Sequence, residues 1–249
     1  VYTEYGPPSV LHVVELDKPV PREKDVLVRV HASTVTSTDC IFRRGDSLFV
    51  RGFTGLRKPK HNVPGDTLAG VVESVGSAVT RFKPGDEVFG SGHQGFGAQA
   101  QYVLVPEDAT LARKPANLSY GEAAAICDGA LTALPFLRDT GKVRPGHCVL
   151  INGASGGIGT FAVQLAKHFG AVVTGVCSGA NVALVQQLGA DHVVDYHTAD
   201  FTATHEAYDI IFDTVGKSSF TRCKPCLKPG GVFLQAAFSP ATFPRVLWT

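Results

Sequence analysis

A glycine-rich turn carries the most specific chemical signal in the sequence. Residues 149–159 read VLINGASGGIG, an apolar stretch ending in a turn, and the helical sequence TFAVQLAKHF follows. A strand that passes through such a turn into a helix leaves backbone N–H groups unpaired at the positive end of the helix dipole, where a pyrophosphate can bind. Gly156 would let phosphates approach the backbone, and Gly159 would let the helix pack closely on the strand. The residues expected to hold the dinucleotide are Gly153, Ala154, Ser155, Gly156, Gly157 and Ile158.

This motif has one departure from the usual pattern and one alternative explanation. Ala154 stands where G-x-G-x-x-G places a glycine, but the required strand, helix and second strand all surround it. The alternative is a tight strand-to-helix turn that binds no ligand. We favour the dinucleotide site because the structural context of the motif is complete.

The loop after the second strand of this region bears on which dinucleotide binds. Residues 176–181 read VCSGAN, without the acidic residue that accepts the ribose 2′-OH of NAD. Ser178 and Asn181 could donate hydrogen bonds to a 2′-phosphate, although no Arg or Lys stands in the loop. The sequence therefore favours NADPH, with NADH the less favoured cofactor. Tyr196, after the third strand, either flanks the adenosine or packs as a strand-end aromatic.

The elements that must position these residues change character along the chain. The N-terminal part has strand-length apolar or alternating runs at 11–17, 25–33, 68–76, 86–90 and 100–106, separated by Pro- and Gly-containing turns. This pattern predicts an irregular β domain over 1–118. From Ser119 onward strands and helices alternate, which predicts a doubly wound parallel sheet over 119–249.

The second region has recognisable helix boundaries and five expected strands. Ser119 and Glu122 form an S-x-x-E capping box at the start of a helix over 119–141, which Pro135 should kink or split. Strands are expected at 147–153, 171–177, 192–196, 208–216 and 230–238. A complete doubly wound dinucleotide domain has six, so the given sequence is expected to be truncated at its C-terminus.

Composition excludes several classes of function. The 249 residues include 23 Lys and Arg against 22 Asp and Glu, a balance that gives no electrostatic footprint for nucleic acid or an anionic membrane. Hydrophobic residues make up 44%, enough for a packed core. The six scattered cysteines do not form a disulfide scaffold, so a cytoplasmic location is expected. Cys223 and Cys226 form a lone C-x-x-C pair, which predicts two half-buried thiols rather than a metal site.

Several longer segments together resemble one enzyme superfamily. They are DVLVRVHAS, TSTDCIFRRG, PGDTLAGVVESVGSAVTRFKPGDEVFG, AQYVLVP, KPANLSYGEAAAICDGALTAL, VLINGASGGIGTFAVQLAKHFGA, LGADHVVDY and FDTVG. The chain resembles the medium-chain dehydrogenase/reductases, in their zinc-less quinone oxidoreductase (zeta-crystallin-like) branch. The resemblance implies a GroES-like β domain joined to a Rossmann domain. It also implies a C-terminal return segment that the given sequence lacks.

The resemblance also indicates further site residues, and it implies that the chain has no zinc site. Zinc-dependent relatives carry Cys and His where this sequence has Thr36 or Ser37 and Asp66, and hydroxyls with a lone carboxylate do not form a zinc site. The family contacts nicotinamide and substrate through segments that correspond here to Thr36 with Asp39, to Thr132, and to Thr214 with Val215. Asp39 is equally well explained as bonding its own turn. The basic stretch 43–60 is expected to be a solvated mobile loop, or alternatively a cationic rim at the cleft.

Without zinc, no Lewis acid is available to polarise an alcohol or ketone. We therefore expect a zinc-independent, NADPH-dependent reductase that transfers hydride to a quinone or an α,β-unsaturated carbonyl, that is, a small electrophilic substrate. The alternatives are a zinc-free carbonyl or alcohol oxidoreductase and a non-catalytic, crystallin-like NADPH-binding protein. The resemblance also suggests a homodimer.

Overall fold

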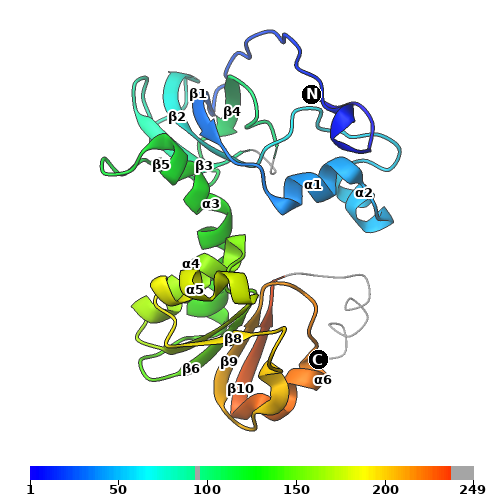
Figure 1. Cartoon of the computed structure of the whole chain (residues 1–249). Coiled ribbons are helices and arrows are strands. Elements are labelled where there is room, and N and C mark those ends of the chain that lie inside the picture. Colours follow the sequence, from blue (N-terminus) through cyan, green and yellow to red (C-terminus); the bar gives the residue numbers. More distant parts are fainter. Residues whose placement is uncertain (93–95, 237–249) are drawn as a thin grey trace. The chain divides into compact units, whose positions relative to one another are not determined.

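The computed structural model describes residues 1–92 and 96–236 of the chain, which fold as two compact units (Figure 1). The units are Val1–Asp128 and Gly129–Thr249, and helix α3 (Tyr120–Pro135) contains the point of division. The domain boundary expected at 118/119 from the sequence stays a prediction.

The N-terminal unit is built on an antiparallel sheet with the strand order β4-β1-β2-β3-β5. Its core is formed by alternate residues of these strands, among them Val26, Val28, Leu68, Val72 and Val88, which are all nearly inaccessible to solvent. The predicted β domain is therefore confirmed as a sheet. The strands are β1 (Asp25–Ser33), β2 (Thr67–Val75), β3 (Glu87–Ser91), β4 (Tyr102–Pro106) and β5 (Leu111–Arg113).

Two expectations for this unit are wrong. Residues 11–17 form no strand, and Leu11, Val13, Val14 and Leu16 are exposed, because apolar alternation alone gives a segment no neighbouring strand to pair with. The stretch 43–60 is not a loop throughout: it contains the end of α1 (Ser37–Arg44) and all of α2 (Leu48–Thr54). Side-chain caps at Thr36 and Ser47 begin these two helices.

Helix α3 begins and ends as the sequence predicts. Ser119 and Glu122 form the reciprocal capping box, with the Ser119 N–H donating to Glu122 Oε2 over 2.8 Å and the Glu122 N–H donating to Ser119 Oγ over 3.3 Å. Pro135 is the last α-helical residue, and a five-residue π-helical turn, Phe136–Thr140, follows it. The missing N–H of proline accounts for the change in hydrogen bonding at this point.

The C-terminal unit contains a parallel sheet with the strand order β10-β9-β6-β7-β8. The strand order reverses at β6, which has β7 on one side and β9 on the other, as in doubly wound folds. The described residues hold the five expected strands; positions 237–238 of the last predicted strand lie outside them. The strands are β6 (Cys148–Asn152), β7 (Val172–Cys177), β8 (His192–Asp195), β9 (Tyr208–Asp213) and β10 (Leu227–Gln235).

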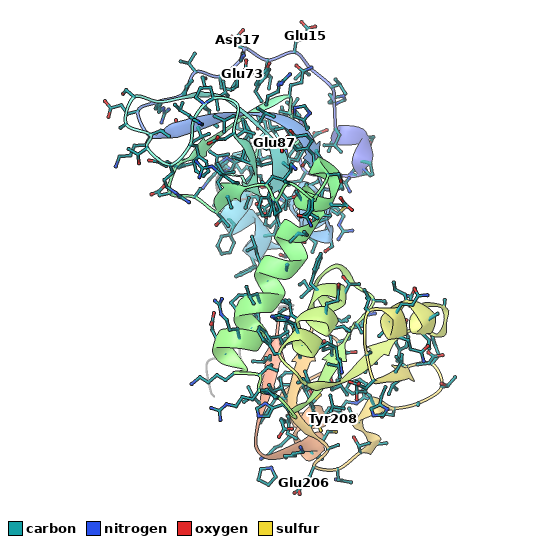
Figure 2. All side chains as sticks on the ribbon, turned by 90° about the vertical axis from the view of Figure 1, so that its left-hand side faces the viewer. Glu15, Asp17, Glu73, Glu87, Glu206 and Tyr208 are labelled. Carbon is teal, nitrogen blue, oxygen red and sulfur yellow. The ribbon has the colours of Figure 1, made fainter. Side chains whose placement is uncertain are left out.

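Both faces of this parallel sheet are buried. Val149 and Ile151 of β6 pack in one apolar cluster, while Leu150 packs in the other together with Tyr208, which is labelled in Figure 2. The helices of the unit are α4 (Gly157–His168), α5 (Val182–Gln187) and α6 (Phe220–Cys223). Among the described residues of the whole chain, no helix has both the length and the apolar composition that crossing a bilayer would need.

Candidate dinucleotide site

In the glycine-rich turn, only the first residue, Gly153, has a backbone conformation that requires glycine. Gly153 has a φ of +83°, whereas Ala154 is not among the residues of positive φ and is fully buried. The N–H groups of Gly153 and Ala154 both donate to the carbonyl of Val176, over 3.0 and 2.9 Å. Alanine is therefore compatible with the second position of the motif.

Beyond these anchored residues, the turn presents free donors. Gly156 is the N-cap of α4, so the first N–H groups of the helix, including those of Gly157 and Ile158, have no partner within the helix. The N–H of Ser155 also has no acceptor in the described part of the chain. These groups provide the unpaired amides and the positive helix end that a pyrophosphate requires. The predicted residues fit a dinucleotide phosphate.

The packing expected of Gly159 is confirmed. A Cβ atom on Gly159 would lie 2.0 Å from the carbonyl oxygen of Gly153 and 2.8 Å from the Cα of Ala154. No side chain can be placed at such distances without moving the backbone. Glycine at this position therefore holds α4 against the turn and fixes where its N-terminus points.

The structure brings three of the predicted residues together. The amide nitrogen of Asn181 donates to Ser155 Oγ over 3.2 Å and to Ser178 Oγ over 3.1 Å. Asn181 thus joins the glycine-rich turn to the loop expected to select the cofactor. The hydroxyl groups of Ser155 and Ser178 and the amide group of Asn181 form one polar surface.

Sequence reasoning missed an acid close to this surface. The Asp195 Oδ2 atom lies 2.7 Å from where a Cβ of Gly179 would stand, so the end of β8 supplies a carboxylate beside the loop after β7. This carboxylate can accept a hydrogen bond from a ribose hydroxyl, and its charge would repel a 2′-phosphate. The signal available in the sequence was an aspartate ending the third apolar strand, and the parallel pairing of Cys177 with Asp195 brings it beside this loop. The ring of Tyr196, the next residue, is 54% exposed and therefore accessible rather than packed in the core.

A second loop reaches the turn at the strand-order reversal. Thr214 Oγ1 donates to the carbonyl of Asn152 over 2.8 Å, and a Cβ on Gly153 would lie 2.4 Å from a methyl of Val215. The loops after β6 and β9 are thus in contact, at the place where ligands bind in open parallel sheets. Thr214 and Val215 therefore lie against the glycine-rich turn, and their contact with nicotinamide stays a prediction.

Asp213, which the sequence analysis did not select, organises this second loop. Its buried Oδ1 accepts hydrogen bonds from the Asn152 side chain and from the N–H groups of Val215 and Gly216, at 3.0 to 3.1 Å. Its Oδ2 accepts from the N–H of Ser218 over 3.2 Å. The signal available in the sequence was an aspartate ending an apolar strand, since a buried carboxylate needs several donors.

Thr132 lies on the helix that crosses the start of α4. A Cβ on Gly129 would stand 2.2 Å from the carbonyl oxygen of Gly157, so α3 packs directly on the first turn of α4. Thr132 is half-buried and follows Gly129 by three residues, which places it on the same side of the helix.

In the N-terminal unit, Thr36 and Asp39 bond each other. Asp39 Oδ2 accepts from the N–H of Thr36 over 2.7 Å and from its hydroxyl over 2.9 Å, while Thr36 Oγ1 accepts from the Asp39 N–H over 3.3 Å. This is a capping box at the start of α1. The geometry favours the turn-bonding alternative for Asp39, and a catalytic role for either residue stays a prediction.

The same unit contains an aspartate of altered acidity. Burial raises the pKa of Asp128, and the nearby carboxylates of Asp66 and Asp39 raise it further. The neighbouring Cys127 is buried, donates its S–H to the carbonyl of Ala123, and has its pKa raised to about 12 by burial.

Within the described residues, no three His, Cys, Asp or Glu side chains are grouped closely enough to hold a metal ion.

Comparison with known proteins places both halves of the chain in one superfamily. Residues 22–116 match the alcohol dehydrogenase GroES-like domain family, and residues 157–246 match the zinc-binding dehydrogenase family. The chain is 36% identical over 255 residues to 2-methylene-furan-3-one reductase from Solanum lycopersicum, covering 97% of this chain and 63% of that protein. It is 33% identical to the chloroplastic quinone-oxidoreductase homolog of Spinacia oleracea, covering 99% of this chain and 77% of that protein.

A solved structure agrees with these relatives. The quinone oxidoreductase from Coxiella burnetii superposes with a TM-score of 0.88 at 32% identity, covering 99% of this chain and 77% of that one. The chain spans less than two thirds of the length of the tomato reductase. The chain belongs to the medium-chain dehydrogenase/reductase superfamily, in its quinone oxidoreductase branch.

Proposed function

We propose that the protein is a zinc-independent, NADPH-dependent reductase of quinones or α,β-unsaturated carbonyls. The observation that carries this proposal is the glycine-rich turn 153–158, which presents free amides at the strand-order reversal and is contacted there by the loop 214–218. The names of relatives support the chemistry: one from Arabidopsis thaliana, 35% identical, is an NADPH-dependent alkenal/one oxidoreductase. The bound dinucleotide would supply the hydride.

The residues of this chain would bind and orient the cofactor. The N–H groups of Ser155, Gly157 and Ile158 would hold the diphosphate, and the Asn181 side chain would keep Ser155 and Ser178 in place beside the ribose. Asp213 would fix the loop carrying Thr214 and Val215. A rigid loop limits the positions that a bound nicotinamide can take, which favours one orientation for transfer.

Reduction of an enone also needs a proton, and the N-terminal unit offers a candidate. Asp128 keeps its proton to a higher pH than an ordinary aspartate, because it is partly buried near Asp66 and Asp39. A carboxyl group whose pKa is raised is a better candidate for a general acid than an ordinary aspartate, because it keeps its proton to a higher pH. We propose Asp128 as a candidate proton donor; a catalytic role for Thr36 or Asp39, in addition to their capping contacts, stays a prediction.

The test is an NADPH oxidation assay against a panel of quinones, enones and simple ketones, with product analysis. We expect turnover with quinones or enones, one NADPH consumed per acceptor reduced, and no loss of activity after treatment with a chelator. Turnover of simple ketones alone would favour the carbonyl reductase alternative. Tight NADPH binding without turnover of any acceptor would favour the crystallin-like alternative. The homodimer and the cytoplasmic location stay predictions.

A further inference from the structure

Helix α2 turns its polar residues inward. The guanidinium of Arg51 lies over the ring of Tyr5, with its carbon 4.9 Å from the ring centroid, and its Nε donates to the carbonyl of Gly45 over 2.7 Å. The Thr54 side chain is only 1% exposed, and its hydroxyl lies 2.7 Å from the Tyr5 hydroxyl. These contacts attach one face of α2 to the N-terminal unit, beside α1 (Figure 1).

The opposite face of the same helix is apolar and exposed. Leu48, Phe49, Gly52 and Phe53 share this face at helical spacing, and the exposed fractions of Leu48 and Phe53 are 80% and 68%. A Cβ on Gly52 would meet no atom within 4 Å. Leu56, just beyond the helix, is 67% exposed. This arrangement reverses the usual one, in which the apolar stripe of a surface helix faces the core.

Basic side chains directly follow this face. Arg57, Lys58 and Lys60 are exposed and form no ion pair within residues 1–92 and 96–236. Asp46 is the sole acidic residue of the stretch 43–60, and Arg44 pairs with it over 2.7 Å. The stretch therefore keeps an excess of positive charge beside its exposed leucines and phenylalanines.

We propose that this apolar face and its basic flank, together the α2 surface, dock on an anionic lipid bilayer. Exposed Leu and Phe side chains can enter the boundary between headgroups and acyl chains, and Lys and Arg beside them attract anionic headgroups. The charge of the surface selects an anionic partner, and its apolar residues select one with an accessible hydrocarbon region. The expectation of no membrane contact rested on the net charge of the whole chain, which averages over this local excess. The proposal does not depend on the proposed enzymatic function.

Vesicle sedimentation tests the proposal directly. The whole protein is mixed with vesicles of phosphatidylcholine alone or of phosphatidylcholine with phosphatidylglycerol. We expect it to sediment with the mixed vesicles, less so at high salt because surface attraction is screened, and to stay in solution with the neutral vesicles. Absence of binding to the mixed vesicles at low salt would overturn the proposal, and would point to an acidic protein partner instead.

Matched variants separate the α2 surface from general charge. The triple variant Arg57→Gln, Lys58→Gln and Lys60→Gln is expected to weaken partitioning about 100-fold, or about fivefold for each basic side chain removed. A control triple variant with the same loss of charge should bind like the wild type; equal weakening of both would contradict a local surface. The control substitutions, at exposed residues elsewhere, are Lys24→Gln, Arg144→Gln and Lys224→Gln.

The apolar contribution is measured with the charges intact. Leu48→Ser with Phe53→Ser should also reduce partitioning, whereas Leu184→Ser, at an exposed leucine of α5, should not. Circular dichroism and melting curves establish that each variant folds. Fluorescence titration should give the same Kd for NADPH in the Gln variants as in the wild type, because the residues proposed to bind it belong to the C-terminal unit. This measurement keeps a failure of docking distinct from a failure of the proposed function.

Discussion

At the scale of single residues, we expect the preference for NADPH or NADH to depend on a carboxylate from a neighbouring strand. Asp195 stands beside Gly179, where its charge opposes a 2′-phosphate. We expect Asp195→Asn to lower the Kd for NADPH about fivefold and to leave that for NADH equal or higher, because a partly exposed charge contributes up to about 1 kcal/mol. Fluorescence titration with both dinucleotides measures this. A parallel change for both would show that Asp195 acts only through folding.

A second residue-scale prediction concerns the proton. Asp128→Asn removes the candidate donor and should lower kcat for enone reduction about 100-fold while leaving NADPH binding intact. The pKa of Asp128 is raised, so the protonated donor is present at low pH and is lost as pH rises through that raised pKa. The kcat of the wild type should therefore fall as pH rises through the pKa of Asp128, whereas the kcat of Asp128→Asn should show no such fall. Asp108→Asn, at an exposed aspartate without a partner among the described residues, is the control. An unchanged kcat in Asp128→Asn would rule out this donor.

At the scale of elements, the close packing of helix α4 on the glycine-rich turn requires that residue 159 has no side chain. Gly159→Ala places a methyl 2.0 Å from the Gly153 carbonyl oxygen, so the helix must move. We expect a loss of about 1 to 3 kcal/mol in the free energy of unfolding and a weaker affinity for dinucleotides. Urea unfolding and cofactor titration measure the two effects. Gly121→Ala in α3, where a Cβ meets nothing within 4 Å, should be neutral or slightly stabilising.

The start of α3 is attached to the N-terminal sheet by a phenol. The Tyr120 hydroxyl donates to Glu87 Oε1 over 2.6 Å, and Glu87 (labelled in Figure 2) also pairs with Lys114. Burial raises the pKa of Tyr120 to about 12, with the Glu87 hydrogen bond adding to the effect.

This shift predicts a loss of stability in base. A phenol with a raised pKa stabilises the fold below its unfolded pKa of about 10, and that contribution disappears as pH rises toward 12. Tyr120→Phe should remove this dependence and cost about 1 kcal/mol at neutral pH. Absorbance titration of tyrosinate should show one fewer phenol ionising near 12, with Tyr2 still contributing there. An unchanged titration curve would contradict the assignment.

At the scale of the whole molecule, the candidate dinucleotide site belongs to one of two compact units. A ligand that binds only the folded form stabilises it by about 2.7 kcal/mol at a free concentration of 100 times Kd. We therefore expect NADPH to raise the unfolding transition of the C-terminal unit in calorimetry and to act on the N-terminal unit less. Gly159→Ala should reduce the shift at a fixed NADPH concentration. No shift with either dinucleotide would remove the basis of the proposed function.

The sequence by itself determined the elements whose signals are local. The capping box at Ser119, the break at Pro135 and the strand–turn–helix around Gly153 follow from dihedral limits and hydrogen-bonding capacity within a few residues. Parallel strands also have a distinctive apolar composition, so the five strands of the C-terminal unit were predictable.

Only the tertiary structure decided which distant residues meet. Residues 11–17 alternate like a strand yet pair with none, and Asp195 and Asp213 reach the site from strands far along the chain. The outward apolar face of α2 likewise depends on Tyr5 holding its other face. Strand pairing and burial depend on contacts between segments that are far apart in the sequence. Local sequence patterns do not specify which of these segments meet.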